Sequence, residues 1–364
     1  MRDTIRWGIL GTGQVAGLFA RGLREIPDAQ LLAVGSRSRQ NADAFAREHG
    51  VPRAYATYED LVRDANVDVV YVATPNSAHR EHCLLALEHG KPVLCEKPFT
   101  LDAAEASAIA ETARARGLFC MEGMWMRFVP VLRELESRVR AGAIGDVRML
   151  TANLGLPIEF DPRHRLFDPK LGGGALLDLG VYPLSLALRL MGRPTRITSQ
   201  AVFGQTGVDE QCTILLEFPE GRQAALTTSV RNRTTDDAAL MGTEGMIHLH
   251  EPLYRPETLS LVRSPRLGGG REVSRMRGYA ERLGLERIKH HPLVREVRQA
   301  VGFVRTERVT RRVLGNGYAH EALEVMRCLR EGLRESPLMP LDESVELMRT
   351  VDAIRREWTR PTPL

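Results

Sequence analysis

The sequence predicts an α/β protein in two parts: a doubly wound parallel sheet, then an α+β domain with a large, mostly antiparallel open sheet. Three observations lead to this prediction. Apolar strands alternate with helical patterns over residues 1–124, strands follow one another with few helices over 125–364, and a glycine-rich turn follows the first strand. Alternation of strands and helices is typical of parallel sheets covered on both faces, and successive strands are typical of antiparallel sheets.

The first part consists of short apolar runs, of which 67–73 (VDVVYVA) is the strongest, each followed by a helical pattern. Such runs suit strands that are buried on both faces of a sheet. Strands are predicted over 5–10, 31–34, 67–73, 92–95 and 118–121. Helices are predicted up to about residue 25 after the glycine turn, and over about 39–49, 77–89 and 102–116.

The second part contains more strands, and turn residues such as Gly207 and the segments 219–221 and 242–245 separate several of them. Strands are predicted over 147–154, 196–203, 212–218, 223–230, 238–242, 246–250 and 258–262. One helical segment, about 175–191, interrupts this series, and two amphipathic helices, about 318–333 and 342–358, close the chain. This order predicts a largely antiparallel sheet.

The composition, with 43% hydrophobic and 26% charged residues over 364 positions, is that of a globular protein. It excludes disorder as the main state, because enough apolar surface is present to offset the entropy of ordering. No run of 18 apolar residues and no secretory leader is visible, so we expect no membrane span. The five cysteines are an odd, scattered set without metal-ligand spacing, which favours reduced thiols in a cytoplasmic protein.

One basic segment, residues 263–312, holds 14 Lys/Arg against 5 Glu, a net charge of +9. Within it Val294, Val297, Val301 and Val304 fall on one helical face behind Pro292. The segment is either an electrostatic patch for nucleic acid, a membrane or an acidic partner, or an amphipathic surface insertion packed on the protein or at a subunit contact. We favour the insertion, because the segment has neither a nucleic-acid reading motif nor interleaved stacking aromatics.

The turn after the first strand reads Gly11-Thr12-Gly13-Gln14-Val15-Ala16. Its glycines allow a tight turn and a close approach of the backbone to a pyrophosphate, while the following helix offers free N–H groups. Because the pattern lies between a strand and a helix near the N-terminus, it predicts a dinucleotide-binding (Rossmann) domain.

The end of the second strand carries Ser36 and Arg37 where NAD-binding proteins usually have a carboxylate. A carboxylate would repel a 2′-phosphate, whereas a hydroxyl and a guanidinium would bind it. We therefore expect NADP(H). NAD(H) remains an alternative, since Arg37 could instead stack on the adenine.

Lysine is rare in this chain, with four residues against 46 arginines, and one of the four lies in Glu96-Lys97-Pro98 directly after a strand. That position is the carboxyl edge of the sheet, where ligands of open α/β sheets bind. Farther on, Asp178 and Tyr182 are four residues apart in an apolar helix, so their side chains point the same way. Lys97 and Tyr182 could form an acid/base unit in which the lysine lowers the pKa of the phenol. The alternative is a capping Asp and a core Tyr.

These motifs resemble the Gfo/Idh/MocA oxidoreductase family. The resemblance rests on the glycine turn, on Thr74-Pro75-Asn76-x-x-His79, on Glu96-Lys97-Pro98 and on Asp178-x-Gly180-x-Tyr182, and it covers nearly the whole chain. The segments 124–128, 173–180 and 335–341 narrow it to the branch of the trans-dihydrodiol dehydrogenases and NADP-dependent D-xylose 1-dehydrogenases, which is related to glucose–fructose oxidoreductase. Many members of the family have His where this chain has Tyr182, and that branch has Tyr.

The resemblance implies roles for several residues. Lys97 would touch the nicotinamide ribose and the substrate, Tyr182 would be the general acid/base, and Asp178 would orient the substrate or support the pair. Asn76, His79 and Glu96, in the neighbourhood of Thr74 and Pro75, would line the ribose and nicotinamide side of the cofactor, and Trp125 and Arg127 would lie near the nicotinamide and substrate. The exposed face of the second sheet would form subunit contacts. The basic insertion, about 266–312, departs from this branch, so the pocket and dimer geometry of the dihydrodiol enzymes do not transfer directly.

Together these expectations describe an NADP-dependent oxidoreductase that acts on a hydroxyl or carbonyl of a sugar, polyol or cyclic diol, without a metal. Two alternatives stay open. One is an enzyme that retains its cofactor and uses it for sugar oxidoreduction. The other is a cofactor-binding regulator that has lost catalysis, with the basic segment holding a partner.

Overall fold

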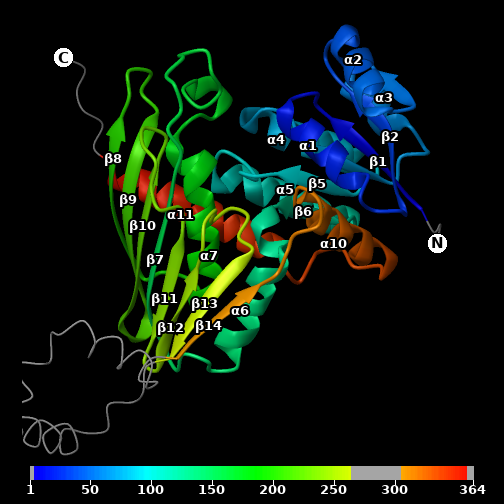
Figure 1. The fold of residues 1–364 in the computed structure, drawn as a ribbon. Coiled ribbons are helices and arrows are strands. Elements are labelled where there is room, and N and C mark those ends of the chain that lie inside the picture. The colour runs from blue at the N-terminus through cyan, green and yellow to red at the C-terminus, as the bar shows by residue number, and fades with distance from the viewer. Residues whose placement is uncertain (1–3, 264–304, 359–364) are drawn as a thin grey trace, which may run out of the picture.

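The computed structural model describes residues 4–263 and 305–358 and contains two sheets, each with helices packed on it (Figure 1). The predicted helical face at Val294–Val304 and most of the basic insertion lie outside these described residues. The predicted two-part α/β architecture is confirmed.

The first sheet is parallel throughout, with the strand order β3-β2-β1-β4-β5-β6. Its strands are β1 (Ile5–Leu10), β2 (Ala29–Gly35), β3 (Arg53–Tyr55), β4 (Val69–Val72), β5 (Val93–Glu96) and β6 (Cys120–Gly123). The helices are α1 (Gln14–Leu23), α2 (Arg39–His49), α3 (Tyr58–Arg63), α4 (His79–Glu88) and α5 (Ala103–Arg116). The order of the strands along the chain reverses between β1 and β4, which is the place where open α/β sheets bind ligands.

Burial on both faces explains the apolar runs of this sheet. All four residues of β4 are buried, and Tyr71 in this strand stacks on Phe19 of α1 with ring centroids 3.7 Å apart. Helix termini follow local capping rules, since Ser38 accepts from the N–H of Asn41 at the start of α2 and Asp102 caps α5. At the start of α1, Gly13 offers no side-chain cap, which leaves N–H groups available to a ligand.

The second sheet has eight strands in the order β14-β13-β12-β11-β7-β10-β9-β8, antiparallel except for the parallel pair β7 and β10. Its strands are β7 (Val147–Gly155), β8 (Arg196–Phe203), β9 (Asp209–Phe218), β10 (Arg222–Ser229), β11 (Ala238–Gly242), β12 (Gly245–Leu249), β13 (Thr258–Arg263) and β14 (Arg305–Thr310). Side chains alternate between a buried and an exposed face, as in β9, where Ile214 is buried and Leu215 is exposed.

Helices cover only one face of this sheet among the described residues (Figure 1). They are α6 (Pro130–Arg140), α7 (Val181–Met191) and α11 (Leu341–Glu357), while α10 (Tyr318–Arg330) returns to pack on α1 of the first domain. The segment Pro169–Met191 is long and apolar enough to cross a membrane by composition, but 89% of its most apolar window is buried inside the protein. This burial identifies it as the core helix of the second domain.

Four elements were not predicted, namely β3, α3, α6 and β14. The first two are only three and six residues long, too short for a periodic pattern to be visible. Strand β14 lies inside the predicted basic insertion and pairs with β13 over its whole length. The predicted C-terminal boundary of the insertion, about residue 312, is therefore too late, since residues 305–310 belong to the sheet. The sequence did not reveal this because charged side chains are typical both of an edge strand and of a surface insertion.

The predicted single helix over about 175–191 is also divided. Leu176–Gly180 forms a π-helical turn, and the α-helix begins at Val181. The Asp209 carboxylate on β9 accepts a hydrogen bond of 2.7 Å from the N–H of Leu176, and the backbone at Gly174 (φ 122°) passes so close that a Cβ there would lie 2.3 Å from Asp209 Oδ1. π-helical turns often occur at functional sites, and this one carries Asp178.

Candidate active site

A cavity of about 940 Å³ opens at the carboxyl ends of β1, β2, β4 and β5, between the two domains. Its volume is that of a site for a large ligand. The residues expected to bind a dinucleotide line it together: Gly11, Thr12, Gly13, Gln14, Val15, Ser36, Arg37, Thr74, Pro75, Asn76, His79, Glu96 and Lys97. Asp178 and Tyr182 line the same cavity, whereas Trp125 and Arg127 are not among its lining residues.

The glycine turn has the shape that a pyrophosphate requires. Gly11 has a φ of 111°, and a Cβ at this position would lie 2.5 Å from the carbonyl oxygen of Ala73. A Cβ built on Gly13 meets no atom within 4 Å, so the space beside it is open. Together with the uncapped start of α1, this turn forms a cradle for an anionic group.

The far end of the cavity, at β2, is lined by hydroxyl groups and one guanidinium. Ser36 is buried, Arg37 is exposed, and Tyr58 of α3 completes this end of the lining. The carboxylates that line the cavity within the described residues are Glu96 and Asp178, both at the opposite end. A 2′-phosphate at β2 would therefore meet donors and no carboxylate.

The loops after β4 and β5 are tied to each other by His79. Its ring nitrogens lie 2.9 Å from the carbonyl oxygen of Thr74 and 2.8 Å from that of Pro98, and burial lowers its pKa to about 4. Asn76 donates a 3.1 Å hydrogen bond to the carbonyl oxygen of Gly172, which joins the first domain to the second. These side chains hold the wall of the cavity in place.

Lys97 reaches from the end of β5 to the π-helical turn of the second domain. Its Nζ donates to the Asp178 carbonyl oxygen at 2.9 Å and to Asp178 Oδ1 at 3.3 Å. Asp178 Oδ1 also accepts from Arg165 at 2.9 Å. Burial acts to raise the pKa of the Asp178 carboxyl, but Lys97 and Arg165 outweigh it and the net shift is downward. Burial acts to lower the pKa of Lys97, but Asp178 and Tyr182 outweigh it, so the net shift of this pKa is upward. Both members of the pair are therefore ionised at neutral pH.

Tyr182 lies next to this ion pair. Lys97 Nζ is 4.9 Å from the centre of the tyrosine ring, and the Trp125 indole N–H donates a 2.7 Å hydrogen bond to the phenol oxygen. We expected Lys97 to lower the pKa of this phenol. Lys97 does act in that direction, as does the Trp125 hydrogen bond, but the expectation left out desolvation: burial outweighs both and raises the pKa of Tyr182 to about 12.

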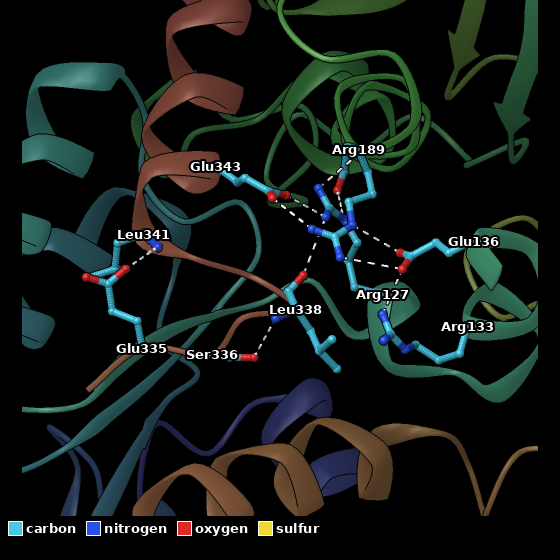
Figure 2. Close-up of polar contacts among 10 residues, drawn as sticks. Arg127, Arg133, Glu136, Arg189, Glu335, Ser336, Leu338, Leu341 and Glu343 are labelled. Atoms are coloured by element: carbon cyan, nitrogen blue, oxygen red, sulfur yellow. Dashed lines mark hydrogen bonds and ion pairs between the residues drawn. The ribbon is translucent and has the colours of Figure 1, made fainter. Parts of the chain in front are cut away.

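Arg127 is not in the cavity. Its side chain is buried in a network of ion pairs between α6, α7 and α11 (Figure 2). It donates to Glu343 Oε2 at 2.7 Å and to the hydroxyl of Ser185 at 2.8 Å. We expected Arg127 to lie near the nicotinamide and substrate. The structure places it elsewhere, because its guanidinium is hydrogen-bonded to partners inside the second domain.

Sequence reasoning missed several residues at the mouth of the cavity. Arg163, His164 and Arg165 come from the loop after β7, and Tyr318 comes from the start of α10. The Tyr318 ring stacks on Trp125 with centroids 4.7 Å apart. No motif marks these positions, and only the return of α10 to the first domain brings Tyr318 to the site.

The charges of the lining suit an anionic cofactor. Arg37, Lys97, Arg163 and Arg165 line the cavity against two carboxylates. No group of three or more His, Cys, Asp or Glu side chains within residues 4–263 and 305–358 could hold a metal ion. The expectation that the chemistry needs no metal stays a prediction.

The sheet order and the glycine cradle define a dinucleotide-binding domain. Residues 5–124 match the family described as "Oxidoreductase family, NAD-binding Rossmann fold", and residues 132–248 match the "GFO/IDH/MocA C-terminal domain". The chain belongs to the Gfo/Idh/MocA oxidoreductase family.

The chain is similar over nearly its whole length to relatives with assigned activities. The trans-1,2-dihydrobenzene-1,2-diol dehydrogenase of Sus scrofa is 34% identical over 97% of this chain and 96% of its own, and that of Xenopus tropicalis is 32% identical over 95% and 96%. Among solved structures, an aldose-aldose oxidoreductase from Caulobacter crescentus complexed with glycerol superposes with a TM-score of 0.79 at 23% identity, covering 97% of both chains. A 3-ketoreductase from Actinomadura kijaniata, in complex with NADP and TDP-benzene, superposes with a TM-score of 0.78 at 23% identity, covering 98% of both.

Proposed function

We propose that this protein is an NADP-dependent oxidoreductase that interconverts a hydroxyl and a carbonyl group of a sugar, polyol or cyclic diol, with Tyr182 as the acid/base. The observation that carries the proposal is the contact of Lys97 with both Asp178 and the Tyr182 ring, inside a cavity of dinucleotide size. When bound, NADP(H) supplies or accepts the hydride at its nicotinamide.

The residues of the chain handle the proton. A phenol with a pKa near 12 is protonated at neutral pH, so Tyr182 can donate its proton to a carbonyl oxygen that is being reduced. In the oxidative direction the phenolate of Tyr182, which the Lys97 cation and the Trp125 N–H stabilise, accepts the proton of the substrate hydroxyl and becomes the neutral phenol. Asp178, held by Lys97 and Arg165, is placed to accept a hydrogen bond from a neighbouring hydroxyl of the substrate.

The polarity of the lining favours substrates with several hydroxyl groups. Arg163, His164, Arg165 and Asp178 line the part of the cavity contributed by the second domain. Charged and hydrogen-bonding groups bind sugar or polyol hydroxyls well, whereas an aromatic diol gains more from apolar walls. The relatives named above act on a dihydrobenzene diol in one case and on aldoses in another, so both classes belong in a substrate panel.

The test uses Tyr182→Phe and Lys97→Met. Each variant is expected to lower turnover about 100-fold or more, because each removes a group that moves or stabilises the proton. Binding of NADP should stay nearly intact in Tyr182→Phe, which retains the ring. Turnover is followed at 340 nm with aldoses, inositols and a trans-dihydrodiol, and NADP binding by fluorescence titration. Near-normal turnover in both variants would refute the assignment.

Two other functions predict different results. An enzyme that retains its cofactor would carry absorbance from NADPH after purification. A regulator without catalysis would bind NADP but turn over no hydroxyl compound, and the presence of Lys97, Asp178 and Tyr182 in one cavity argues against it.

Subunit contacts and location in the cell are part of the same proposal. The open face of the second sheet exposes Leu215, Val202 and Met149, with exposed fractions of 52%, 46% and 38%, and we assign to it a contact between two copies of the chain. All five cysteines are buried free thiols, which suits a cytoplasmic enzyme.

A further inference from the structure

We propose that Arg127 is a positioning residue for Tyr182: by fastening the turn Trp125–Phe128 to helix α7, it holds the Trp125 indole N–H on the phenol oxygen. This inference rests on the proposed acid/base role of Tyr182. Arg127 touches neither the cavity nor any lining residue by a hydrogen bond of its own. Its effect on the reaction would pass through the position of Trp125.

The turn holds helix α7 at two points. Trp125 donates to the phenol oxygen of Tyr182 at 2.7 Å. Arg127, two residues later, donates to Ser185 through Nε, 2.8 Å from its hydroxyl, and through Nη2, 3.1 Å from its carbonyl oxygen. Tyr182 and Ser185 are three apart on one helix, so the two contacts lie about one helical turn from each other. A short turn attached at two such points cannot rotate about either contact alone.

The other side of the guanidinium is fixed by elements distant in the sequence (Figure 2). Arg127 Nη1 donates to Glu343 Oε2 on α11 at 2.7 Å and to the carbonyl oxygen of Leu338 at 3.5 Å. Glu343 Oε1 accepts from Arg189 of α7 at 2.8 Å, and Arg189 continues to Glu136 of α6. A guanidinium with only 3% exposure needs such a set of acceptors, which also fixes its own orientation.

Arg127 can be removed while each carboxylate that is hydrogen-bonded in this network keeps a cation. Glu343 keeps its contact with Arg189, and Glu136 keeps Arg189 and Arg133. Besides its 3.5 Å contact with the carbonyl oxygen of Leu338, Arg127 alone supplies the link to Ser185 and hence the second attachment of the turn. The loss expected on its removal is therefore one of geometry at the Trp125–Tyr182 contact.

That contact has a measurable consequence, because the Trp125 hydrogen bond lowers the pKa of Tyr182. The other charged and titratable groups that act on Tyr182 are Lys97, Glu96, Asp178, Arg165 and Tyr318. None of them is hydrogen-bonded to Arg127. Loosening the turn should thus raise the pKa of Tyr182 while leaving the Lys97–Asp178 pair unchanged.

The experiment measures the single-turnover rate of substrate oxidation against pH for Arg127→Met and for Ser185→Ala, which removes only the hydroxyl acceptor. In Arg127→Met the raised pKa of Tyr182 should displace the rising limb of the rate–pH profile by about one pH unit toward higher pH. The rate at a fixed pH on that limb then falls about tenfold. The dissociation constant of NADP should not change. Ser185→Ala should shift the profile in the same direction by less, and it carries the test if Arg127→Met does not fold.

Two comparisons separate positioning from general damage. Trp125→Phe should give the same shift, and the double variant with Arg127→Met should add nothing to it, since both act on one hydrogen bond. The matched control is Arg138→Met on α6, which loses ion pairs with Glu134 and Glu307 without touching α7 and should leave the profile in place.

Glu122 needs a separate control because Arg127 lowers its pKa, which burial raises to about 7. The shift must persist when Arg127→Met is made in a Glu122→Gln background. An unmoved profile in folded Arg127→Met or Ser185→Ala, a shift as large in Arg138→Met, or additive shifts in the double variant would overturn the inference. If Tyr182→Phe keeps its turnover, the proposed function itself fails. If Tyr182→Phe is inactive and Arg127→Met is normal, only the positioning role fails.

Discussion

At the scale of single residues, the site holds an ionised pair next to a neutral phenol. Lys97 and Asp178 are held ionised by each other, while Tyr182 beside them is kept neutral by burial. A neutral phenol next to a fixed cation can release a proton and then be stabilised as an anion, without either neighbour changing its own charge. At the other end of the cavity, Ser36 and Arg37 present donors without a carboxylate.

Replacing Arg37 by Ala tests the cofactor preference. A charge-assisted hydrogen bond to a 2′-phosphate contributes about 1.5–3 kcal/mol, so the dissociation constant of NADP should rise about 10- to 100-fold. The dissociation constant of NAD, which has no such phosphate, should change little. Titration of both cofactors against both proteins measures the difference, and an equal loss for NAD and NADP would assign Arg37 to adenine stacking instead.

Glu122 predicts a pH dependence of stability. Burial raises the pKa of this carboxyl to about 7 in the folded protein, above its ordinary value. The folded chain then binds a proton more tightly than the unfolded chain, so the free energy of unfolding falls as the pH rises through the window between the two values, by up to about 3 kcal/mol.

Glu122→Gln should flatten that dependence, because the amide cannot ionise. Urea denaturation midpoints at pH 5 and pH 8 measure the change, with Glu88→Gln, an exposed carboxylate, as the control. A midpoint difference equal to that of the unaltered protein would contradict the assignment.

At the scale of elements, the π-helical turn Leu176–Gly180 and helix α7 deliver Asp178, Tyr182 and Ser185 from one continuous segment. The start of this segment is fixed by the Asp209 carboxylate on β9, and its side is fixed by the turn Trp125–Phe128. The geometry of the proposed acid/base site is thus set by the contacts of one helix with a strand and a turn. The sequence predicted the helix but not its π-helical start, since the hydrogen bond from Asp209 comes from a strand more than 30 residues away.

Asp209→Ala should therefore reduce both stability and turnover. It leaves the buried N–H of Leu176 without its acceptor, at a cost of about 1–3 kcal/mol in the free energy of unfolding. Asp209→Asn keeps an acceptor oxygen and should retain most of the stability. Chemical denaturation and kcat are measured on both variants, and equal behaviour of the two would argue against a capping role.

At the scale of the whole molecule, the second sheet has helices on one face only within the described residues (Figure 1). The first domain and the start of the returning helix α10 line the cavity together with the second domain. The open face carries exposed apolar side chains on β7, β8 and β9. This arrangement leaves the active site on one side of the second domain and the proposed subunit contact on the other.

Leu215→Arg on the open face should convert an oligomer into monomers, because a charge would then be buried at the contact. Light scattering after size-exclusion chromatography measures the mass. Leu323→Arg on α10, equally a substitution of an exposed leucine, should leave the mass unchanged. An unaltered protein that is already monomeric would remove the proposed contact.

The sequence alone determined the two sheets, the glycine turn and the positions of Lys97, Asp178 and Tyr182. All of these can be predicted from local patterns, namely the spacing of apolar residues and the short motifs at strand ends. The tertiary structure decided the place of Arg127, the contributions of Arg165 and Tyr318, and the direction of the pKa shift of Tyr182. These depend on burial and on neighbours far away in the chain, since the charge state of a buried group is set by the balance between desolvation and the charges packed around it.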